Sequence, residues 1–159
     1  MARAFDIQPV RTPADLAAVS ELFRDYAASL PVDLRYQDFA AELAALPGKY
    51  APPDGDLLIA RGASGELLGC VGLRPLSMEG CCEMKRLFLR PAARGLGLGR
   101  AMSEAVIAAA RWRGYGELRL DTLPTMTAAI GLYAHMGFEV IAPYYAPTPP
   151  GTIFLGLRL

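Results

Sequence analysis

Residues 87–100 read Leu87-Phe88-Leu89-Arg90-Pro91-Ala92-Ala93-Arg94-Gly95-Leu96-Gly97-Leu98-Gly99-Arg100. The apolar run from Glu83 to Arg90 predicts a strand, which Pro91 closes. The run from Leu98 to Arg113 predicts a helix, and Gly114 stands where a helix commonly ends. The sequence therefore predicts a strand, a glycine-rich turn and a helix N-terminus in direct succession.

The position of this turn favours the binding of an anion. Several backbone N–H groups at a helix N-terminus lack partners within the helix, and the helix dipole places about half a positive charge there. Glycine at alternate positions lets the backbone come close to a phosphate, and Arg94 and Arg100 add positive charge on either side. The predicted diphosphate site consists of Arg94, Gly95, Leu96, Gly97, Leu98, Gly99 and Arg100.

Other interpretations of the turn fit less of the sequence. A Walker A loop is excluded, because no Gly-Lys-Ser or Gly-Lys-Thr follows the glycines. A dinucleotide-binding fingerprint gains support from Asp121, which ends a predicted strand about twenty residues on. However, Arg100 stands where that fingerprint needs its third glycine, and 159 residues are few for a two-halved Rossmann sheet. The dinucleotide interpretation and a purely structural turn stay open as alternatives.

Periodicity and turn residues along the chain predict the element order βααβββαβαββ. The predicted strands cover residues 5–10, 57–61, 67–73, 83–90, 117–121, 138–141 and 152–157. The predicted helices cover residues 13–30, 39–46, 98–113 and 126–136. In the third helix the predicted buried stripe is Leu98, Met102, Ala105, Ala109 and Trp112. This order predicts a mixed sheet with helices packed on it, in one domain that spans residues 1–159.

The composition is typical of a globular protein. Hydrophobic residues make up 53% of the 159 residues and charged residues 20%, which is enough apolar surface for a packed core. A formal net charge of zero argues against broad binding to nucleic acid or to an anionic membrane. The N-terminus lacks the apolar core of a signal peptide and no later run could span a bilayer, so we expect a cytoplasmic location.

The chain has three cysteines, Cys70, Cys81 and Cys82. An odd number with an adjacent pair is poor geometry for a disulfide or for a metal site. We therefore expect three reduced thiols within strands, and no metal.

Two segments resemble the signature motifs of the GNAT acetyltransferases. Residues 87–99 resemble motif A, Gln/Arg-x-x-Gly-x-Gly/Ala, which Arg94, Gly97 and Gly99 match in full. The second segment, Ala129-Ile130-Gly131-Leu132-Tyr133-Ala134-His135-Met136-Gly137-Phe138, resembles motif B, A-x-x-L-Y-x-x-x-G-F. The resemblance covers residues 57–159 in element order and is specific from 83 to 138. It implies an α/β (α+β) GNAT fold, with a mixed, mostly antiparallel sheet of about seven strands flanked by about four helices.

The resemblance implies an enzyme that transfers an acetyl group from acetyl-CoA to a primary amine by direct attack in a ternary complex. Acetyl-CoA would be the co-substrate, without a metal. The backbone of Leu87, Phe88 and Leu89 would pair with the pantetheine arm, and a splay between this strand and residues 117–121 would hold the thioester. Many members carry Asn where Met126 stands, so the amide contact of that residue is not expected here. A non-catalytic acyl-CoA sensor or interaction module stays open as an alternative.

The resemblance also implies two catalytic residues. Tyr133 lies where a phenol would protonate the departing thiolate, although its place on an apolar helix face also fits a core aromatic. Glu83 begins the strand before the turn and resembles the general-base glutamate of histone-type members. A solvated or salt-bridged strand-end carboxylate near Lys85 and Arg86 is the alternative. Glu83, Lys85, Leu87 and Leu89 share one face of the strand if no bulge intervenes.

The acceptor amine stays open in the sequence. In the family it is bound by variable parts, which here correspond to residues 30–36 and 144–151. Their tyrosines could line that pocket or simply anchor their loops; they are Tyr36, Tyr144 and Tyr145. We expect His135 to be exposed and Asp121 to cap a strand end or lie in a turn. A homodimer is compatible with the sequence.

Overall fold

The computed structural model describes residues 4–159, apart from the side chain of Tyr36; residues 1–3, part of the segment inspected for a signal peptide, lie outside this range. The observed element order confirms the predicted one. The strands are β1 (Phe5–Pro9), β2 (Asp56–Gly62), β3 (Leu67–Pro75), β4 (Cys81–Leu89), β5 (Glu117–Thr122), β6 (Glu139–Val140) and β7 (Ile153–Arg158). The α-helices are α1 (Pro13–Ser29), α2 (Phe39–Ala44), α3 (Leu98–Trp112) and α4 (Thr127–His135). Short 3₁₀ helices cover Leu34–Gln37, Gly48–Tyr50 and Pro91–Ala93.

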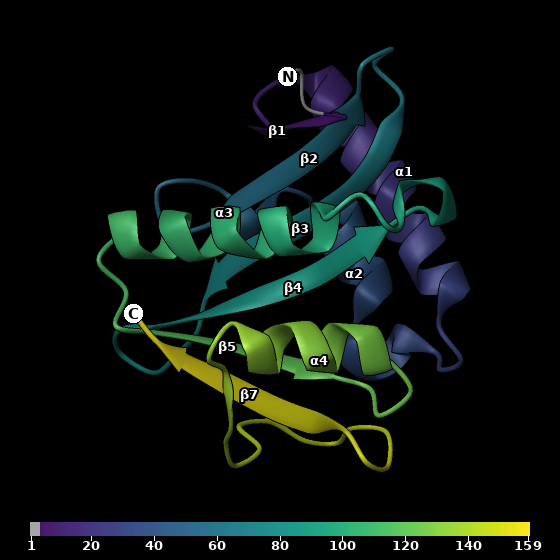
Figure 1. Cartoon of the computed structure of the whole chain (residues 1–159). Helices are drawn as coiled ribbons and strands as arrows, with labels where there is room; N and C mark the ends of the chain where they lie inside the picture. Colours follow the sequence, from purple (N-terminus) through teal and green to yellow (C-terminus); the bar gives the residue numbers. More distant parts are fainter. Residues whose placement is uncertain (1–3) are drawn as a thin grey trace.

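The strands form one sheet of seven in the order β1-β2-β3-β4-β5-β7-β6 (Figure 1). All neighbours pair antiparallel except β4 and β5, which run parallel. Parallel neighbours need a crossover connection, and α3 supplies it between these two strands. The prediction of a mixed, mostly antiparallel sheet is therefore confirmed.

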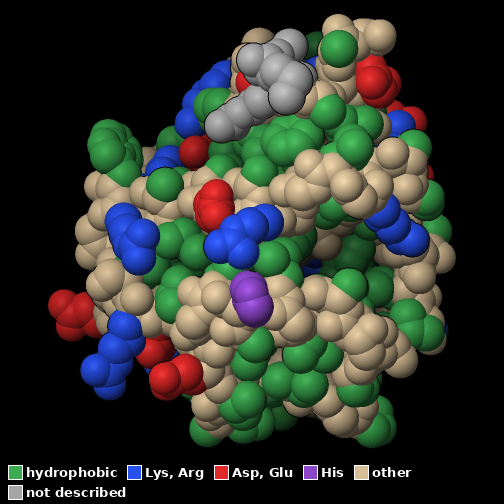
Figure 2. Space-filling model, viewed as in Figure 1, with side chains coloured by type: hydrophobic (Ala, Val, Ile, Leu, Met, Phe, Trp, Pro, Cys, Tyr) green, Lys and Arg blue, Asp and Glu red, His purple; other side chains and the backbone are tan. Residues whose placement is uncertain are grey.

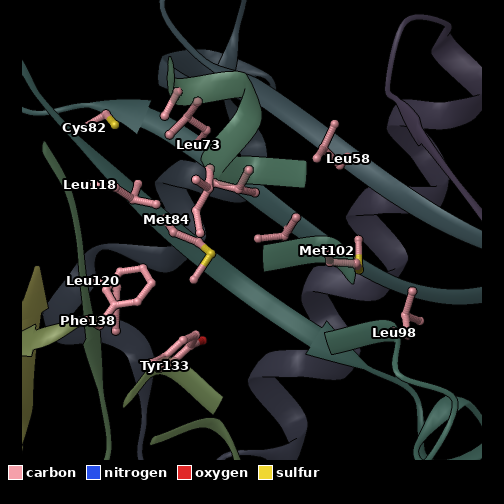
Figure 3. Packing of buried hydrophobic residues seen from close by; sticks show 14 of the residues in the cluster. Leu58, Leu73, Cys82, Met84, Leu98, Met102, Leu118, Leu120, Tyr133 and Phe138 are labelled. Atoms are coloured by element: carbon pink, nitrogen blue, oxygen red, sulfur yellow. The ribbon is translucent and has the colours of Figure 1, made fainter. Parts of the chain in front are cut away.

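Helices cover both faces of the sheet. In Figure 1, α3 and α4 lie in front of the sheet, and α1 and α2 lie behind it. The front cluster of buried side chains joins α3 and α4 to the sheet and includes Leu98, Met102 and Tyr133 (Figure 3). The rear cluster joins α1 to the sheet and includes Leu22 and Phe23. The sheet is thus the middle of three layers.

The start of α1 follows its sequence signals. The side-chain oxygen of Thr12 accepts a hydrogen bond from the backbone N–H of Asp15 at 3.1 Å, and Pro13 occupies the first turn. Val19 and Leu22 on the inner face are fully buried. Burial of each such side chain stabilises the fold by about 1.5–3 kcal/mol. These contacts hold α1 against the rear of β3 and β4.

The predicted buried stripe of α3 is wrong at its C-terminal end, because Trp112 is 84% exposed. The buried positions of the helix are Leu98, Met102, Ser103, Val106, Ile107 and Ala110. At about 100° per residue, these positions centre on a direction roughly a third of a turn away from that of Trp112. The periodicity of the helix therefore carries Trp112 out to solvent, while Leu98 and Met102 remain in the core.

A β-bulge interrupts the pairing of β4 with β3. The register shifts between Cys70 and Gly72, and Arg86 on the opposite strand adopts a left-handed backbone conformation with φ of 60°. A bulge inserts one extra residue and so reverses the alternation of side chains along its strand. Met84 and Leu87, three positions apart, consequently both pack into the front cluster.

Four side chains of β4 were expected to share one face if no bulge intervened, and the bulge means that they do not. Glu83 and Lys85 lie on the rear face of the sheet, whereas Leu87 and Leu89 lie on the front face. Glu83 is therefore not aligned with the residues that lead into the glycine-rich turn.

Two further findings bear on the class of protein. Cys70 lies in β3, Cys81 and Cys82 lie in β4, and all three are free thiols, as predicted. Within residues 4–159, no helix combines the length and the apolarity needed to cross a membrane.

Candidate active site

β4 and β5 separate soon after their pairing begins. The paired residues are Cys81 with Glu117, Cys82 with Leu118, and Glu83 with Arg119. Beyond Glu83, β3 still pairs with one edge of β4, while the edge that faces β5 is left open. A cleft of about 470 Å³, lined by residues of both strands, occupies this splay. The splay expected between these strands is thus present.

The cleft is lined from both sides of the sheet and has two ends of different character. The turn end lies on the side of α3 and α4 and is defined by Leu89, Arg94 and Gly99. The polar end lies on the side of α1 and is defined by Gln37, Lys85 and Asp121. Figure 2 shows the turn end as a hollow in the surface between α3 and α4. A ligand entering from one side can therefore meet a second ligand from the other.

At the turn end the glycine-rich turn leads directly into α3. Gly97 is the N-cap residue with φ of 75°, and Gly95 has φ of 82°. A Cβ added at either position would meet nothing within 4 Å, so lack of space does not explain these glycines. The left-handed backbone conformation explains them, because other residues rarely adopt it. No side chain caps the helix, which leaves its first N–H groups available to an anion.

The two arginines that flank the turn differ in availability. Arg94 is exposed and lines the cleft, and its side chain forms no ion pair or hydrogen bond with a residue that the structure describes. Arg100 is directed along the outside of α3, where its Nε lies 3.0 Å from Oε1 of Glu104. Arg94 is therefore the better placed of the two to bind an anion in the cleft.

The five apolar residues of the predicted site divide into two groups. Leu87, Phe88 and Leu89 line the cleft, on the strand whose edge is open. The side chains of Leu96 and Leu98 do not line it: Leu98 is fully buried in the front core, and Leu96 is 44% exposed beside β1. Leu98 could therefore contact a ligand only through its backbone groups, and the Leu96 side chain lies outside the cleft.

Tyr133 lies in the wall of the cleft, on the inner face of α4. Its ring packs against Phe138 with centroids 5.5 Å apart, and its hydroxyl points away from that ring (Figure 3). The hydroxyl makes no hydrogen bond to a described residue, yet every fully enclosed side-chain oxygen in the described range has a partner. It must therefore open onto the cleft. Burial raises the pKa of Tyr133, so the phenol stays protonated at neutral pH.

Glu83 lies next to the cleft but does not line it. Its side chain is 1% exposed and both oxygens are occupied. Nε of Arg74 donates a hydrogen bond to Oε1 at 2.8 Å, and the hydroxyl of Tyr144 donates one to Oε2. The structure thus shows a salt-bridged carboxylate, whose partner is Arg74 and neither Lys85 nor Arg86. The carboxylate that lines the cleft belongs to Asp121.

Asp121 does not merely cap a strand end, because it joins a polar network across the cleft. The Tyr145 hydroxyl donates to Oδ2 of Asp121, and Nε2 of Gln37 lies 3.4 Å from the same oxygen. The Lys85 ammonium lies 3.9 Å from Oδ1 of Asp121. Burial raises the pKa of Asp121 and lowers that of Lys85, so each shift favours the neutral form.

Arg86, at the bulge of β4, ties the polar end to α2. Its Nε and Nη2 donate to the two oxygens of Glu42 at 3.0 and 3.1 Å, and its Nη1 donates to Oε1 of Gln37 at 2.6 Å. The ring of Phe39 lies 5.1 Å from the guanidinium carbon. A bidentate pair of this kind fixes both partners. It also holds Gln37 beside Asp121, so that the rear wall of the cleft is preorganised.

The segments expected to bind an acceptor are partly present at the polar end. Leu30 and Leu34 line the cleft. The hydroxyls of Tyr144 and Tyr145 bind the two carboxylates described above and support the site from behind. The side chain of Tyr36 lies outside the part that the structure describes. His135, on the outer face of α4, is exposed as predicted.

Comparison with known proteins agrees with this geometry. Residues 17–138 match the model of the Acetyltransferase (GNAT) family. Over 153 residues the chain is 39% identical to an uncharacterised N-acetyltransferase of Schizosaccharomyces pombe. The alignment covers 96% of this chain and 94% of that protein.

Solved structures show the same similarity. A Klebsiella pneumoniae protein described as a candidate acyl-CoA N-acyltransferase is 30% identical, with a TM-score of 0.76 over 98% of this chain and 97% of that one. A Salmonella typhimurium protein solved with its cofactor acetyl-CoA is 21% identical and shares the fold, with a TM-score of 0.74 over 97% of this chain and 93% of that one. The chain belongs to the GNAT family and is an acyl-CoA-dependent N-acetyltransferase.

Proposed function

We propose that this enzyme transfers the acetyl group of acetyl-CoA to a primary amine by direct attack within the cleft between β4 and β5. The observation that carries the proposal is the Tyr133 hydroxyl, which opens onto the cleft without a hydrogen-bond partner among the described residues. A phenol so placed can protonate a departing thiolate. The family match, and the Salmonella protein solved with acetyl-CoA, support acetyl-CoA as the co-substrate.

The residues at the turn end fit acetyl-CoA. The uncapped N-terminus of α3 and the unpaired Arg94 would hold the pyrophosphate. The open backbone edge of residues 87–89 would pair with the amides of the pantetheine arm. Arg100, engaged by Glu104, would add charge from farther away. When bound, acetyl-CoA supplies its acetyl group as a thioester, from which an amine can displace a thiolate.

The transfer requires one proton to reach the sulfur and one to leave the nitrogen. The neutral amine nitrogen forms a bond to the acetyl carbon while the carbon–sulfur bond breaks, and the sulfur keeps the electron pair of that bond. Tyr133 then donates its proton, or a hydrogen bond, to the sulfur. The new amide nitrogen gives up one proton to a base or to water, and a proton from solvent restores the phenol. The products are the N-acetylated acceptor and a free thiol.

A base role for Glu83 stays a prediction. Its oxygens already accept hydrogen bonds from Arg74 and Tyr144, and its side chain does not line the cleft. Any proton that Glu83 takes from the amine must therefore travel through water or through the Tyr144 hydroxyl. Direct transfer of the proton to water is the other route.

The location and the assembly of the enzyme also stay predictions of the sequence. A cytoplasmic enzyme, with neither nucleic-acid nor membrane partners, is the working proposal. A homodimer is compatible with the sequence, and light scattering would detect it.

Release of free thiol from acetyl-CoA across a panel of acceptors tests the proposal. The panel should contain simple primary amines, amino acids, aminoglycoside antibiotics and a peptide with a free N-terminus. We expect acceptor-dependent release with at least one class, and mass spectrometry should show one added acetyl group on the acceptor. A non-catalytic acyl-CoA sensor would bind acetyl-CoA in calorimetry and release no thiol with any acceptor, which would overturn the proposal.

A further inference from the structure

Lys85 places an ammonium group inside the protein with only loose contacts, a long ion pair to Asp121 and a position 5.8 Å from the centroid of the Tyr145 ring. The residue is 4% exposed, on the rear face of β4 at the polar end of the cleft. Its ammonium donates no hydrogen bond to a residue that the structure describes; the nearest charge is Oδ1 of Asp121, at 3.9 Å. Because every fully enclosed side-chain nitrogen in the described range has a partner, the ammonium must touch the open cleft. The ammonium can therefore donate a hydrogen bond to a ligand there.

Asp121 faces Lys85 with Oδ1, the carboxylate oxygen that accepts fewer hydrogen bonds from side chains. Its Oδ2 accepts from the Tyr145 hydroxyl and from Nε2 of Gln37, which fixes the carboxylate in place. Its Oδ1 is the oxygen directed toward Lys85. The polar end thus presents one positive and one negative group side by side, both open to the same space.

The separation of these two groups is unusual for a structural ion pair. By comparison, Arg86 and Glu42 form an ion pair with two hydrogen bonds of 3.0 and 3.1 Å. A buried pair stabilises a fold only when close hydrogen bonds repay its desolvation, and 3.9 Å is too long for one. Lys85 and Asp121 are therefore desolvated without full mutual satisfaction, as expected of groups that a ligand completes.

We infer that Lys85 and Asp121 form the acceptor site, and that the acceptor is a small amine carrying a carboxylate close to its amino group, as in an α-amino acid. The acceptor carboxylate binds the Lys85 ammonium, and the acceptor amino group lies against Oδ1 of Asp121. This inference rests on the proposed acetyl transfer and specifies its substrate class.

The charges around the cleft limit the choice of acceptor. Arg86 is neutralised by Glu42, and Arg74 by Glu83, so neither is free to bind a second anion. At the polar end Lys85 and Asp121 remain for the ligand as one positive and one negative group, which suits a zwitterionic head group better than a phosphate or a polyamine. The adjoining wall is apolar and is made by Leu30, Leu34 and Leu123. An apolar side chain on the acceptor would pack there.

Matched pairs of acceptors test this inference. We would measure kcat/KM by thiol release for leucine against 3-methylbutylamine, and for phenylalanine against 2-phenylethylamine; within each pair the second compound lacks only the carboxylate. We expect the amino acid to be preferred by about 10- to 100-fold, the range for a hydrogen bond between charged groups. Equal or better use of the simple amines would overturn the inference and leave the proposed function standing.

Variants locate the effect. Lys85→Met should remove the preference by lowering kcat/KM for the amino acids alone, whereas Asp121→Asn should lower it for both members of a pair. Lys49→Met is the matched control, because Lys49 is the only other lysine of the chain and is exposed on a 3₁₀ helix; it should change neither kcat/KM. Equal losses for both acceptors in Lys85→Met would contradict a carboxylate contact. Lys85→Gln serves if the methionine variant fails to fold.

Binding without turnover separates the two proposals. Leucine should bind to the wild-type protein saturated with coenzyme A, and Lys85→Met should weaken that binding by about tenfold or more in calorimetry. If leucine binds in this way but no amine releases thiol, the acceptor site stands and the proposed function fails. If amines release thiol but leucine binds equally to both proteins, the acceptor site fails alone.

Discussion

The two ends of the cleft are built in opposite ways. The turn end offers backbone groups: the N-terminus of α3, two glycines with positive φ, and the open edge of β4. The polar end offers side chains from four separate segments, namely Gln37, Lys85, Asp121 and Tyr145. Contiguous residues make the first end, whereas the packing of distant segments makes the second. A shared cofactor can be held by the first, and the second is free to vary with the acceptor.

Because the two ends are built differently, substitutions should affect them in different ways. The backbone at the turn depends on glycine at two positions, so most substitutions there act on the ligand through chain conformation. At the polar end each charge has a partner that would be left exposed or unpaired, so substitutions act through electrostatics. The predictions below test whether the two ends fail in these distinct ways.

The largest expected effect lies where the two ends meet, at Tyr133. Tyr133→Phe keeps the ring that packs against Phe138 and removes only the hydroxyl, which has no hydrogen-bond partner in the described part of the chain. If that hydroxyl protonates the thiolate, the chemical step should slow by about 10²- to 10⁴-fold. Single-turnover measurement is required, because product release can mask the step.

A matched control for this variant is Tyr115→Phe. Tyr115 donates its hydroxyl to the carbonyl oxygen of Asp54 and does not line the cleft, so the rate should be unchanged. The free energy of unfolding of Tyr133→Phe should stay within about 0.5 kcal/mol of the wild type, since no hydrogen bond is lost. A normal single-turnover rate would leave Tyr133 as a packing residue, with protonation from solvent.

Most of the fold could be predicted because its signals are local. Thr12 and Pro13 mark the start of α1, and a strand before glycines and a helix marks the turn. The failures arise where a side chain responds to distant partners. Arg86 takes a positive φ in a strand without glycine, and its guanidinium is held by Glu42, 44 positions earlier in the chain. No local pattern signals that bulge.

The candidate site shows the same division. The residues of the turn could be predicted by position, because the anion site consists of the backbone of a helix N-terminus. The polar end could not, because Asp121 meets Tyr145 from 24 positions away and Gln37 from 84. Two adjacent charged residues within a strand, such as Lys85 and Arg86, indicate a solvated position when only the sequence is read, yet both residues are buried. Their unusual position in an apolar strand was the available signal.

The second prediction concerns the backbone of the turn end. Gly97→Val places a branched residue at φ of 75°, where strain of about 1–3 kcal/mol is expected. If the strained turn opens to relieve it, the dissociation constant of coenzyme A should rise by roughly 10- to 100-fold in calorimetry. Gly114→Val is the matched control, because Gly114 follows the C-terminus of α3 with a similar φ of 84° and does not line the cleft. A folded Gly97→Val protein with normal binding would remove the turn from the site.

The third prediction separates the two arginines of the turn end. Arg94→Ala should weaken coenzyme A binding by about tenfold, since a charge-assisted contact to a phosphate is lost. Arg100→Ala should change it by less than about threefold, because Arg100 is already paired with Glu104 at an exposed position. Calorimetry at two salt concentrations measures both. Unchanged affinity in the double variant would contradict the phosphate role of these side chains, and equal single effects would contradict the difference between them.

The smallest expected effect on chemistry is at Glu83, beside the polar end. Glu83→Gln keeps the shape of the side chain but removes the charge that Arg74 and Tyr144 contact. The free energy of unfolding should fall by about 1.5–3 kcal/mol, the range for hydrogen bonds to charged groups. Because Glu83 does not line the cleft, the single-turnover rate should fall by less than about tenfold, short of the 10²- to 10⁴-fold typical of a general base. Chemical denaturation and single-turnover kinetics on one preparation separate these effects. A rate loss of about 100-fold or more with unchanged unfolding would support Glu83 as the base, acting through water.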